Sequence, residues 1–226
     1  MSANHAVFNV IFRFIENYVS PIAGRISSQR HVMAIRDGFI SAMPFMIVGS
    51  FLLVFAYPPF SPDTTWGFAR AWLDLAKQYE GRILTPFDMT MGIMSIYVCA
   101  AIAYNLGKHY VKSHQLDPFM CAMLALMAFL LVASPKTNGT LPVDSLGGVG
   151  IFTAILVAVF CVEMMRFLKT YNIGIRLPEQ VPPMIKNSFD LLIPVLVVVL
   201  TLYPLSLFIQ TQFDMLIPQA IMALFK

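Results

Sequence analysis

Long stretches of the chain carry no Asp, Glu, Lys or Arg. A helix needs roughly 17–25 residues to cross a hydrocarbon core of about 30 Å, and five uncharged windows match that length. These windows do not alternate polar and apolar residues as strands of a membrane β-barrel would, and helices satisfy their own backbone hydrogen bonds in lipid. The pattern therefore predicts an all-α integral membrane protein with five transmembrane helices, within Gly38–Pro62, Met89–Gly107, Pro118–Pro135, Ser145–Val162 and Leu191–Phe213.

Two segments outside these windows are expected to lie along the membrane surface. Apolar residues recur at helical spacing from Phe8 to Val19, which predicts an amino-terminal amphipathic helix. Arg13 and Glu16 interrupt this segment, so it does not resemble a cleaved signal peptide. The stretch Thr65–Tyr79 contains two Trp residues and predicts an interfacial helix on the outer surface.

The pattern divides the chain into three parts. Residues 1–35 form an amphipathic cytoplasmic segment, residues 36–212 form the five-span domain, and residues 213–226 form a carboxyl-terminal segment. The uncharged stretch in this last part is too short to cross a bilayer. It is expected to be either a surface helix broken near Pro218 or the opening of a segment that the chain does not complete.

Composition excludes a soluble domain. Hydrophobic residues make up 58% of the chain and charged residues 12%, whereas a water-soluble surface needs roughly 25–35% charged residues. The net charge of +3 comes from scattered basic residues, which does not indicate a nucleic-acid partner.

The placement of the basic residues predicts the orientation in the membrane, because cytoplasmic loops carry the excess of Lys and Arg. Of the 15 basic residues, ten fall before the first span or in the second and fourth connections, and the remaining five fall on the other side. This distribution places the amino terminus in the cytoplasm and the end of the fifth span outside. The outward set is Arg70, Lys77, Arg82, Lys136 and Lys226.

The sequence predicts no catalytic residue, no metal site and no cofactor. Cys99, Cys121 and Cys161 each lie in an apolar stretch without paired spacing and are expected to be buried. His109 and His114 do not share one helical face. Substrate-binding residues are not identifiable from the pattern.

Charged residues and prolines near or inside the spans suggest functional positions. Glu163 stands three residues before Arg166, which favours a same-face pair. This pair is either an interfacial ion pair or a gating or partner contact. Pro44, Pro194 and Pro204 fall inside predicted spans and are expected to bend them.

The connection before the fifth span combines prolines with polar side chains. Three prolines prevent a regular helix, and polar groups lie between them and the span. We expect a stiff loop at the cytoplasmic mouth that acts as a gate or partner contact, or alternatively a spacer that positions the fifth span. The residues of this candidate loop are Pro178, Glu179, Gln180, Pro182, Pro183, Asn187 and Ser188.

Three stretches carry a resemblance to a known family. The segment Ile175–Pro194 resembles the signature before the fifth span of the membrane component IIC of sugar phosphotransferase systems, in the lactose, cellobiose and chitobiose branch. Gln29–Phe51 resembles the first span of that branch, and Gly92–Tyr97 agrees more weakly. The resemblance runs over nearly the whole chain in the same order.

The resemblance implies a permease component of the bacterial cytoplasmic membrane for a disaccharide or β-glucoside such as cellobiose or chitobiose. It also implies ten spans in two halves, a phosphocysteine-bearing IIB protein and a IIA protein as partners, and a homodimer formed by the amino-terminal half. This chain matches that half alone, so the family's sugar-binding His and Glu have no counterpart here, and a separately encoded carboxyl-terminal half would be needed for transport.

Small residues on the first span, Gly38 and Ala42, suit close packing at a dimer interface, or packing within the chain. Two alternatives to a permease half remain. One is a shortened fragment that does not transport, and the other is a small self-contained channel or carrier that pairs two five-span chains.

Overall fold

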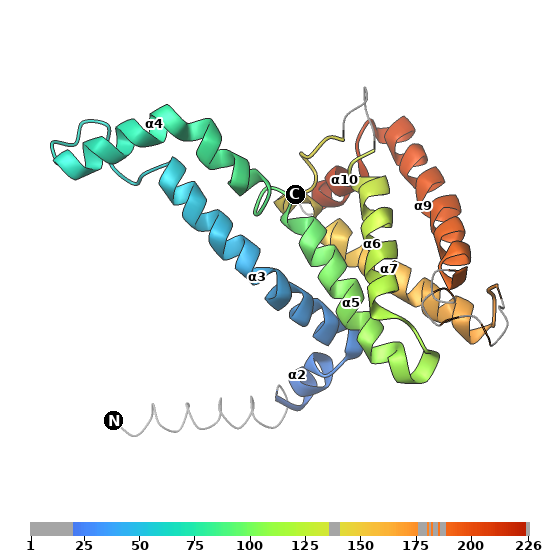
Figure 1. Ribbon diagram of the computed structural model, residues 1–226. Helices are drawn as coiled ribbons and strands as arrows, with labels where there is room; N and C mark the ends of the chain where they lie inside the picture. Colours follow the sequence, from blue (N-terminus) through green and yellow to red (C-terminus); the bar gives the residue numbers. More distant parts are fainter. Residues whose placement is uncertain are drawn as a thin grey trace, which may run out of the picture.

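The computed structural model describes residues 20–135, 141–175, 180, 182, 185 and 189–224, and over these residues the chain is helical without strands (Figure 1). The predicted amino-terminal helix, Phe8 to Val19, lies outside the described residues. The helices are α2 (Ser20–Ser27), α3 (Arg30–Ala56), α4 (Gly67–Asp88), α5 (Met94–His114), α6 (Pro118–Ala133), the short 3₁₀ helix η2 (Gly148–Gly150), α7 (Ile151–Thr170), α9 (Leu192–Phe213) and α10 (Ile217–Ala223).

Helix α5 is the centre of the bundle. It packs against α3, α6 and α7, and α9 lies on the far side of α6 and α7 (Figure 1). Apolar residues from α5, α6 and α7 are fully shielded in this core, where close van der Waals packing between helices is the stabilising contact. Prominent among them are Val98, Ile102, Leu106, Phe129 and Val162.

Helices α3 and α4 form an arm beside the bundle. The outer part of α3 runs away from α6, α7 and α9, and α4 packs along it (Figure 1). Trp72 joins the two helices: its ring packs at 5.6 Å from the Phe55 ring and its indole N–H donates to the Phe55 carbonyl over 3.1 Å. At the end of α3 the Tyr57 hydroxyl donates to Glu80 over 2.9 Å, and this hydrogen bond raises the pKa of Tyr57.

Three helical stretches are long and apolar enough to cross a membrane: Arg30–Ala56, Gly148–Thr170 and Leu192–Phe213. Helix α6 is equally apolar but shorter, at 16 residues, and α5 carries charged residues near its carboxyl end. The all-helical membrane fold is thus confirmed. The count of five spans stays a prediction.

Several helices extend beyond the uncharged windows that predicted them. Helix α3 begins at Arg30 and therefore crosses the expected boundary at residue 35, and α7 continues through Glu163 and Arg166. Helix α5, predicted as the second span, begins at Met94, five residues later than its window. Helix α4, predicted as an interfacial helix over Thr65–Tyr79, runs from Gly67 to Asp88. Charged side chains at a helix end reach the polar interface, so an absence of charge marks the lipid-facing part of a helix and not its ends.

The prolines do not all behave as expected. Pro44 and Pro204 lie inside α3 and α9. Pro194 lies in the first turn of α9, where a missing N–H costs no helical hydrogen bond, so the expected bend at this residue is wrong. Pro218 likewise lies at the start of α10 and is buried with Ile217, so it begins that helix and does not break it.

Gly38 and Ala42 face into the chain. Both are buried, and a Cβ atom placed on Gly38 would lie 2.4 Å from Ile102 Cγ1 of α5. The assignment of these two residues to a dimer interface is therefore wrong. Their small size allows α3 and α5 to approach closely, which is the other role expected of small residues in membrane helices.

Candidate functional site

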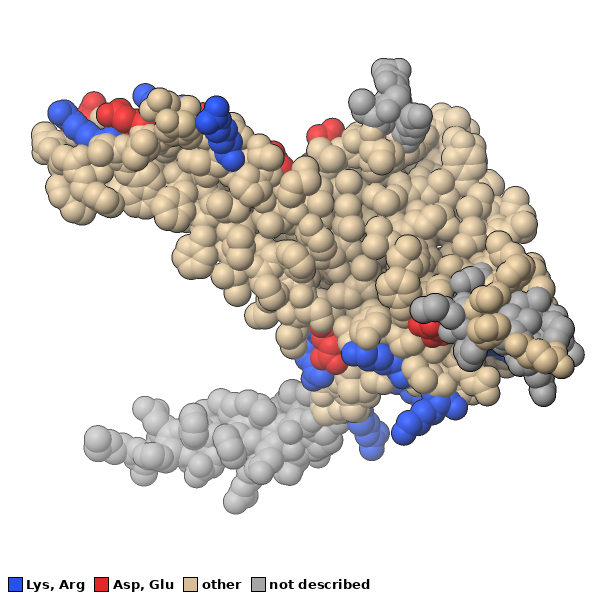
Figure 2. All heavy atoms as spheres, in the orientation of Figure 1, with Lys and Arg blue, Asp and Glu red and all other residues tan. Residues whose placement is uncertain are grey.

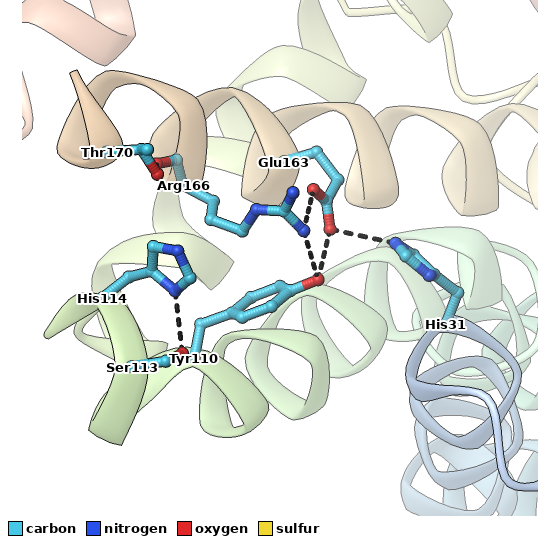
Figure 3. A network of polar contacts seen from close by, with 7 residues as sticks. All are labelled: His31, Tyr110, Ser113, His114, Glu163, Arg166 and Thr170. Carbon is cyan, nitrogen blue, oxygen red and sulfur yellow. Dashed lines mark hydrogen bonds and ion pairs between the residues drawn. The ribbon is translucent and has the colours of Figure 1, made fainter.

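The Glu163 carboxylate of α7 is the centre of a polar network that joins three helices (Figure 3). Its Oε1 accepts a hydrogen bond from the Tyr110 hydroxyl of α5 over 2.6 Å and lies 2.9 Å from His31 Nε2 of α3. Its Oε2 pairs with Arg166 over 2.8 Å. The Arg166 guanidinium also donates to the Tyr110 hydroxyl over 2.9 Å. One carboxylate thus receives contacts from all three helices.

Local sequence explains why these groups meet. Glu163 and Arg166 are three residues apart on α7 and share a face. Tyr110 lies about one turn before the end of α5 and is 1% exposed, and a buried Tyr hydroxyl requires a polar partner. His31 is the second residue of α3. The first turn of α3 and the last turns of α5 and α7 therefore meet around the Glu163 carboxylate.

The network suits a structural link better than an acid–base centre. Both carboxylate oxygens are engaged, and the Glu163 side chain is 28% exposed, so solvent partly screens its ion pair. The predicted Glu163–Arg166 pair is confirmed. Its place in a three-helix network adds a role in holding α3, α5 and α7 together.

A second ion pair connects α7 to the start of α9. Lys169 pairs with Asp190, and both side chains line a hollow with Asn172, Gly174 and Pro194. The hollow is lined by residues on both sides of the connection between α7 and α9. The Lys169–Asp190 pair therefore fixes the carboxyl end of that connection to α7.

The candidate loop is largely beyond what the structure describes. Gln180 and Pro182 are described and exposed, and the Pro182 carbonyl accepts from the Ile185 amide over 3.0 Å. The other five residues lie outside the described residues: Pro178, Glu179, Pro183, Asn187 and Ser188.

The remaining candidates for chemistry have structural surroundings. The three cysteines are free and buried, as expected. His114 Nδ1 lies 2.8 Å from the Ser113 hydroxyl, and its ring packs edge-on against Tyr110. Among the described residues, no group of three or more His, Cys, Asp or Glu side chains is placed to hold a metal ion.

Two members of the network, His31 and Tyr110, were not predicted. They are far from Glu163 in sequence, with separations of 132 and 53 residues, so no local spacing points to them. The available signal was Glu163 itself, because a carboxylate within an apolar helix requires polar partners from its neighbours.

The family described as "Phosphotransferase system, EIIC" matches residues 36–225. Among curated proteins, the cellobiose-specific EIIC component of Geobacillus stearothermophilus is 35% identical over 206 residues, covering 83% of this chain and 43% of that protein. The oligo-beta-mannoside-specific EIIC component of Bacillus subtilis (strain 168) is 32% identical, covering 94% of this chain and 49% of that protein. The lactose-specific EIICB component of Staphylococcus aureus (strain COL) is 34% identical, covering 91% of this chain and 35% of that protein.

A solved structure shares the fold. The transporter ChbC, the IIC component from the N,N'-diacetylchitobiose-specific phosphotransferase system, superposes with a TM-score of 0.77 at 32% identity, covering 92% of this chain and 50% of ChbC. The chain spans about half the length of the curated relatives named as permease IIC or EIIC components, and 35% of the lactose-specific EIICB component.

Proposed function

This chain belongs to the EIIC family of the phosphotransferase system, and from that membership we propose that it is part of a membrane permease for a β-linked disaccharide such as cellobiose or chitobiose. The likeness in fold to a chitobiose IIC transporter, together with the cellobiose-specific relative, carries this proposal. We further propose that it works with IIB and IIA proteins. Support for the IIB partner comes from relatives named as EIICB components.

We propose that these 226 residues do not transport sugar without a further membrane half. They correspond to about half of the relatives named as EIIC components and to 35% of the relatives named as EIICB components.

The distribution of charge supports a position in a membrane. On the face shown in Figure 2, charged side chains lie over α4 and at the opposite end of the bundle, with an uncharged region between them. The division into residues 1–35, 36–212 and 213–226 stays a prediction.

Sugar uptake provides the test of function. Cells that lack their own β-glucoside permease and express these 226 residues with IIA and IIB should not accumulate phosphorylated cellobiose or chitobiose. Co-expression of the carboxyl-terminal half of the Geobacillus cellobiose relative should restore accumulation, because it supplies the part of that relative that these residues do not match. Radiolabelled sugar in the phosphorylated fraction is the measurement.

Controls give each result one meaning. Full-length Geobacillus EIIC with the same IIA and IIB confirms the assay, and membrane immunoblotting confirms that both halves are present. Uptake by the 226 residues alone would favour the self-contained carrier. Absence of uptake with a half that is present and inserted would favour the non-transporting fragment.

The same assay tests the candidate loop. Replacing Glu179, Gln180 and Asn187 with Ala should lower restored uptake without lowering membrane abundance if the loop is a gate or a partner contact. The control is Gln115→Ala, at an exposed residue that caps the end of α5. Unchanged uptake in the triple variant would leave the loop as a spacer.

We propose that the chain forms a homodimer through the arm, because large apolar side chains such as Phe51, Phe55 and Phe68 are exposed there, and van der Waals packing of such faces drives association of membrane helices. Single cysteines at the exposed Leu75 and Phe68 of α4 should cross-link between copies in membranes. A cysteine at the exposed Leu156 of α7 should cross-link much less. Equal or absent cross-linking at all three positions would contradict the arm as the interface.

We propose that the amino terminus is cytoplasmic and that the protein lies in the bacterial cytoplasmic membrane. A cysteine replacing Lys77 on α4 should react with an impermeant thiol reagent in intact cells, and one replacing Lys112 near the end of α5 should react after permeabilisation alone. The buried native cysteines give a low background. The reverse labelling pattern would overturn the orientation.

A further inference from the structure

A basic hollow lies beside the Glu163 network, at the end of the bundle where α3 begins and α5 and α7 end. It has a volume of about 360 Å³ and is lined by Arg30, His31, Tyr110 and Arg166, together with Ser28 and Gln29 from the turn before α3. Tyr110 and Arg166 reach it from α5 and α7. Two guanidinium groups and one imidazole therefore line one opening.

The cations gather around a single aromatic ring. The guanidinium carbon of Arg166 lies 5.1 Å from the centre of the Tyr110 ring, and that of Arg30 lies 5.7 Å from the same centre. Both distances fall within the range of cation–π attraction. The ring thus holds two like charges close together that would otherwise repel.

The carboxylate beneath them is already engaged. Glu163 receives His31 and Tyr110 at one oxygen and Arg166 at the other. Arg30 is exposed, and among the residues that the structure describes its guanidinium contacts the Tyr110 ring without an ion pair to Asp or Glu. The hollow therefore keeps an excess of positive charge that one carboxylate does not neutralise.

The level of the hollow indicates which anions reach it. Arg30 and His31 open α3, and Tyr110 and Arg166 lie about one turn before the ends of α5 and α7. Phospholipid phosphates lie at this depth where apolar helices leave the hydrocarbon core, and basic pockets between transmembrane helices recognise such head groups. Arginine suits this ligand because its planar donors match phosphate oxygens.

We propose that Arg30, His31 and Arg166 form a binding site for a phosphate group, supplied by the head group of an anionic phospholipid or by free phosphate. Arg30 donates to the phosphate directly. Tyr110 and Glu163 hold Arg166 at the wall of the hollow, so the site is preorganised and needs little ordering on binding.

The test uses the purified, delipidated 226-residue protein in mild detergent. Phosphatidylglycerol and phosphatidylcholine are titrated separately, and bound lipid is counted by native mass spectrometry. The variant is Arg30→Gln. The matched control is Arg36→Gln, which removes the same charge from the same helix, but from an arginine that pairs with Asp37 over 2.8 Å and does not line the hollow.

We expect the wild-type protein to bind phosphatidylglycerol more tightly than phosphatidylcholine. Arg30→Gln should weaken phosphatidylglycerol binding about fivefold, the factor that corresponds to about 1 kcal/mol for one basic residue at an anionic lipid surface. Arg36→Gln should retain wild-type affinity. Because Arg30 is exposed, its loss should leave the unfolding midpoint in lipid-free micelles unchanged.

A competition experiment separates the two sources of phosphate and uses the wild-type protein alone. Free phosphate is a ligand of the site if millimolar inorganic phosphate displaces phosphatidylglycerol. Sodium chloride at the same ionic strength is the control and should not displace the lipid. If phosphate does not displace the lipid, the head group is the ligand. Equal weakening in both variants, or no preference for phosphatidylglycerol and no effect of phosphate, would overturn the proposal.

Discussion

Replacing Gly38 with Ala should lower the free energy of unfolding by about 1–3 kcal/mol, the usual cost of inserting a methyl group into a packed core. The added Cβ would lie 2.4 Å from Ile102 Cγ1, 2.9 Å from Ile102 N and 3.0 Å from Ile102 Cα. Two of these atoms belong to the backbone of α5 and cannot rotate away. The helices α3 and α5 must therefore separate, which also loosens Val98 and Leu106 in the core. Denaturant titration in mild-detergent micelles measures the change.

Gly81→Ala is the matched control for this substitution. Gly81 lies in the interior of α4, and a Cβ placed there has no atom within 4 Å. Since Ala favours a helix over Gly by about 1 kcal/mol, this variant should be as stable as the wild type or more stable. Both substitutions gain the same helix propensity, so the difference between them reports packing against Ile102. Equal stability of the two variants would contradict the close contact of α3 with α5.

The positions of the helices were predictable because the bilayer imposes a simple requirement. A segment that crosses lipid cannot expose charge in its middle, so each uncharged window overlaps one helix. The same rule fails at the ends. Arg36 and Asp37 lie inside α3, and Lys108 and Lys112 lie inside α5. The long Arg and Lys side chains reach the interface while their backbone stays helical, and Asp37 is paired with Arg36.

The partners of small residues were not predictable from spacing. Gly38 and Ala42 lie one turn apart, which brings another helix close whether that helix belongs to the same chain or to a second copy. Ile102 of α5 fills that space, and its position 64 residues further along the chain carries no sequence signal. The choice between packing within the chain and between chains depends on tertiary structure.

Only the Glu163–Arg166 pair of the candidate site was predictable from the sequence. Spacing on one helix brings Glu163 and Arg166 together, and the sequence predicts this pair. Tyr110 and His31 join it only because α3 begins where α5 and α7 end. A carboxylate inside an apolar helix implies polar partners on neighbouring helices. The sequence does not show which residues those partners are.

Glu163→Gln should lower the free energy of unfolding by about 2 kcal/mol, near the value of one or two hydrogen bonds to a charged group. Glutamine keeps the shape of glutamate but has one acceptor oxygen and no charge. It can still accept from Tyr110, while its amide group turns donors toward the Arg166 guanidinium in place of an acceptor. Contacts from α3, α5 and α7 to one carboxylate are therefore weakened together.

Asp37→Asn is the matched change at an ion pair that lies within one helix. Arg36 and Asp37 are neighbours on α3, with side chains 60% and 40% exposed, and exposed pairs contribute about 0–1 kcal/mol. Both substitutions remove the charge of a carboxylate that pairs with an arginine. Of the two carboxylates, Glu163 connects separate helices and Asp37 does not. A larger loss at Glu163 therefore measures what the three-helix network adds to the fold. Similar losses in both variants would mean that packing around Gly38 and Ile102, and not the network, holds α3 against α5 and α7.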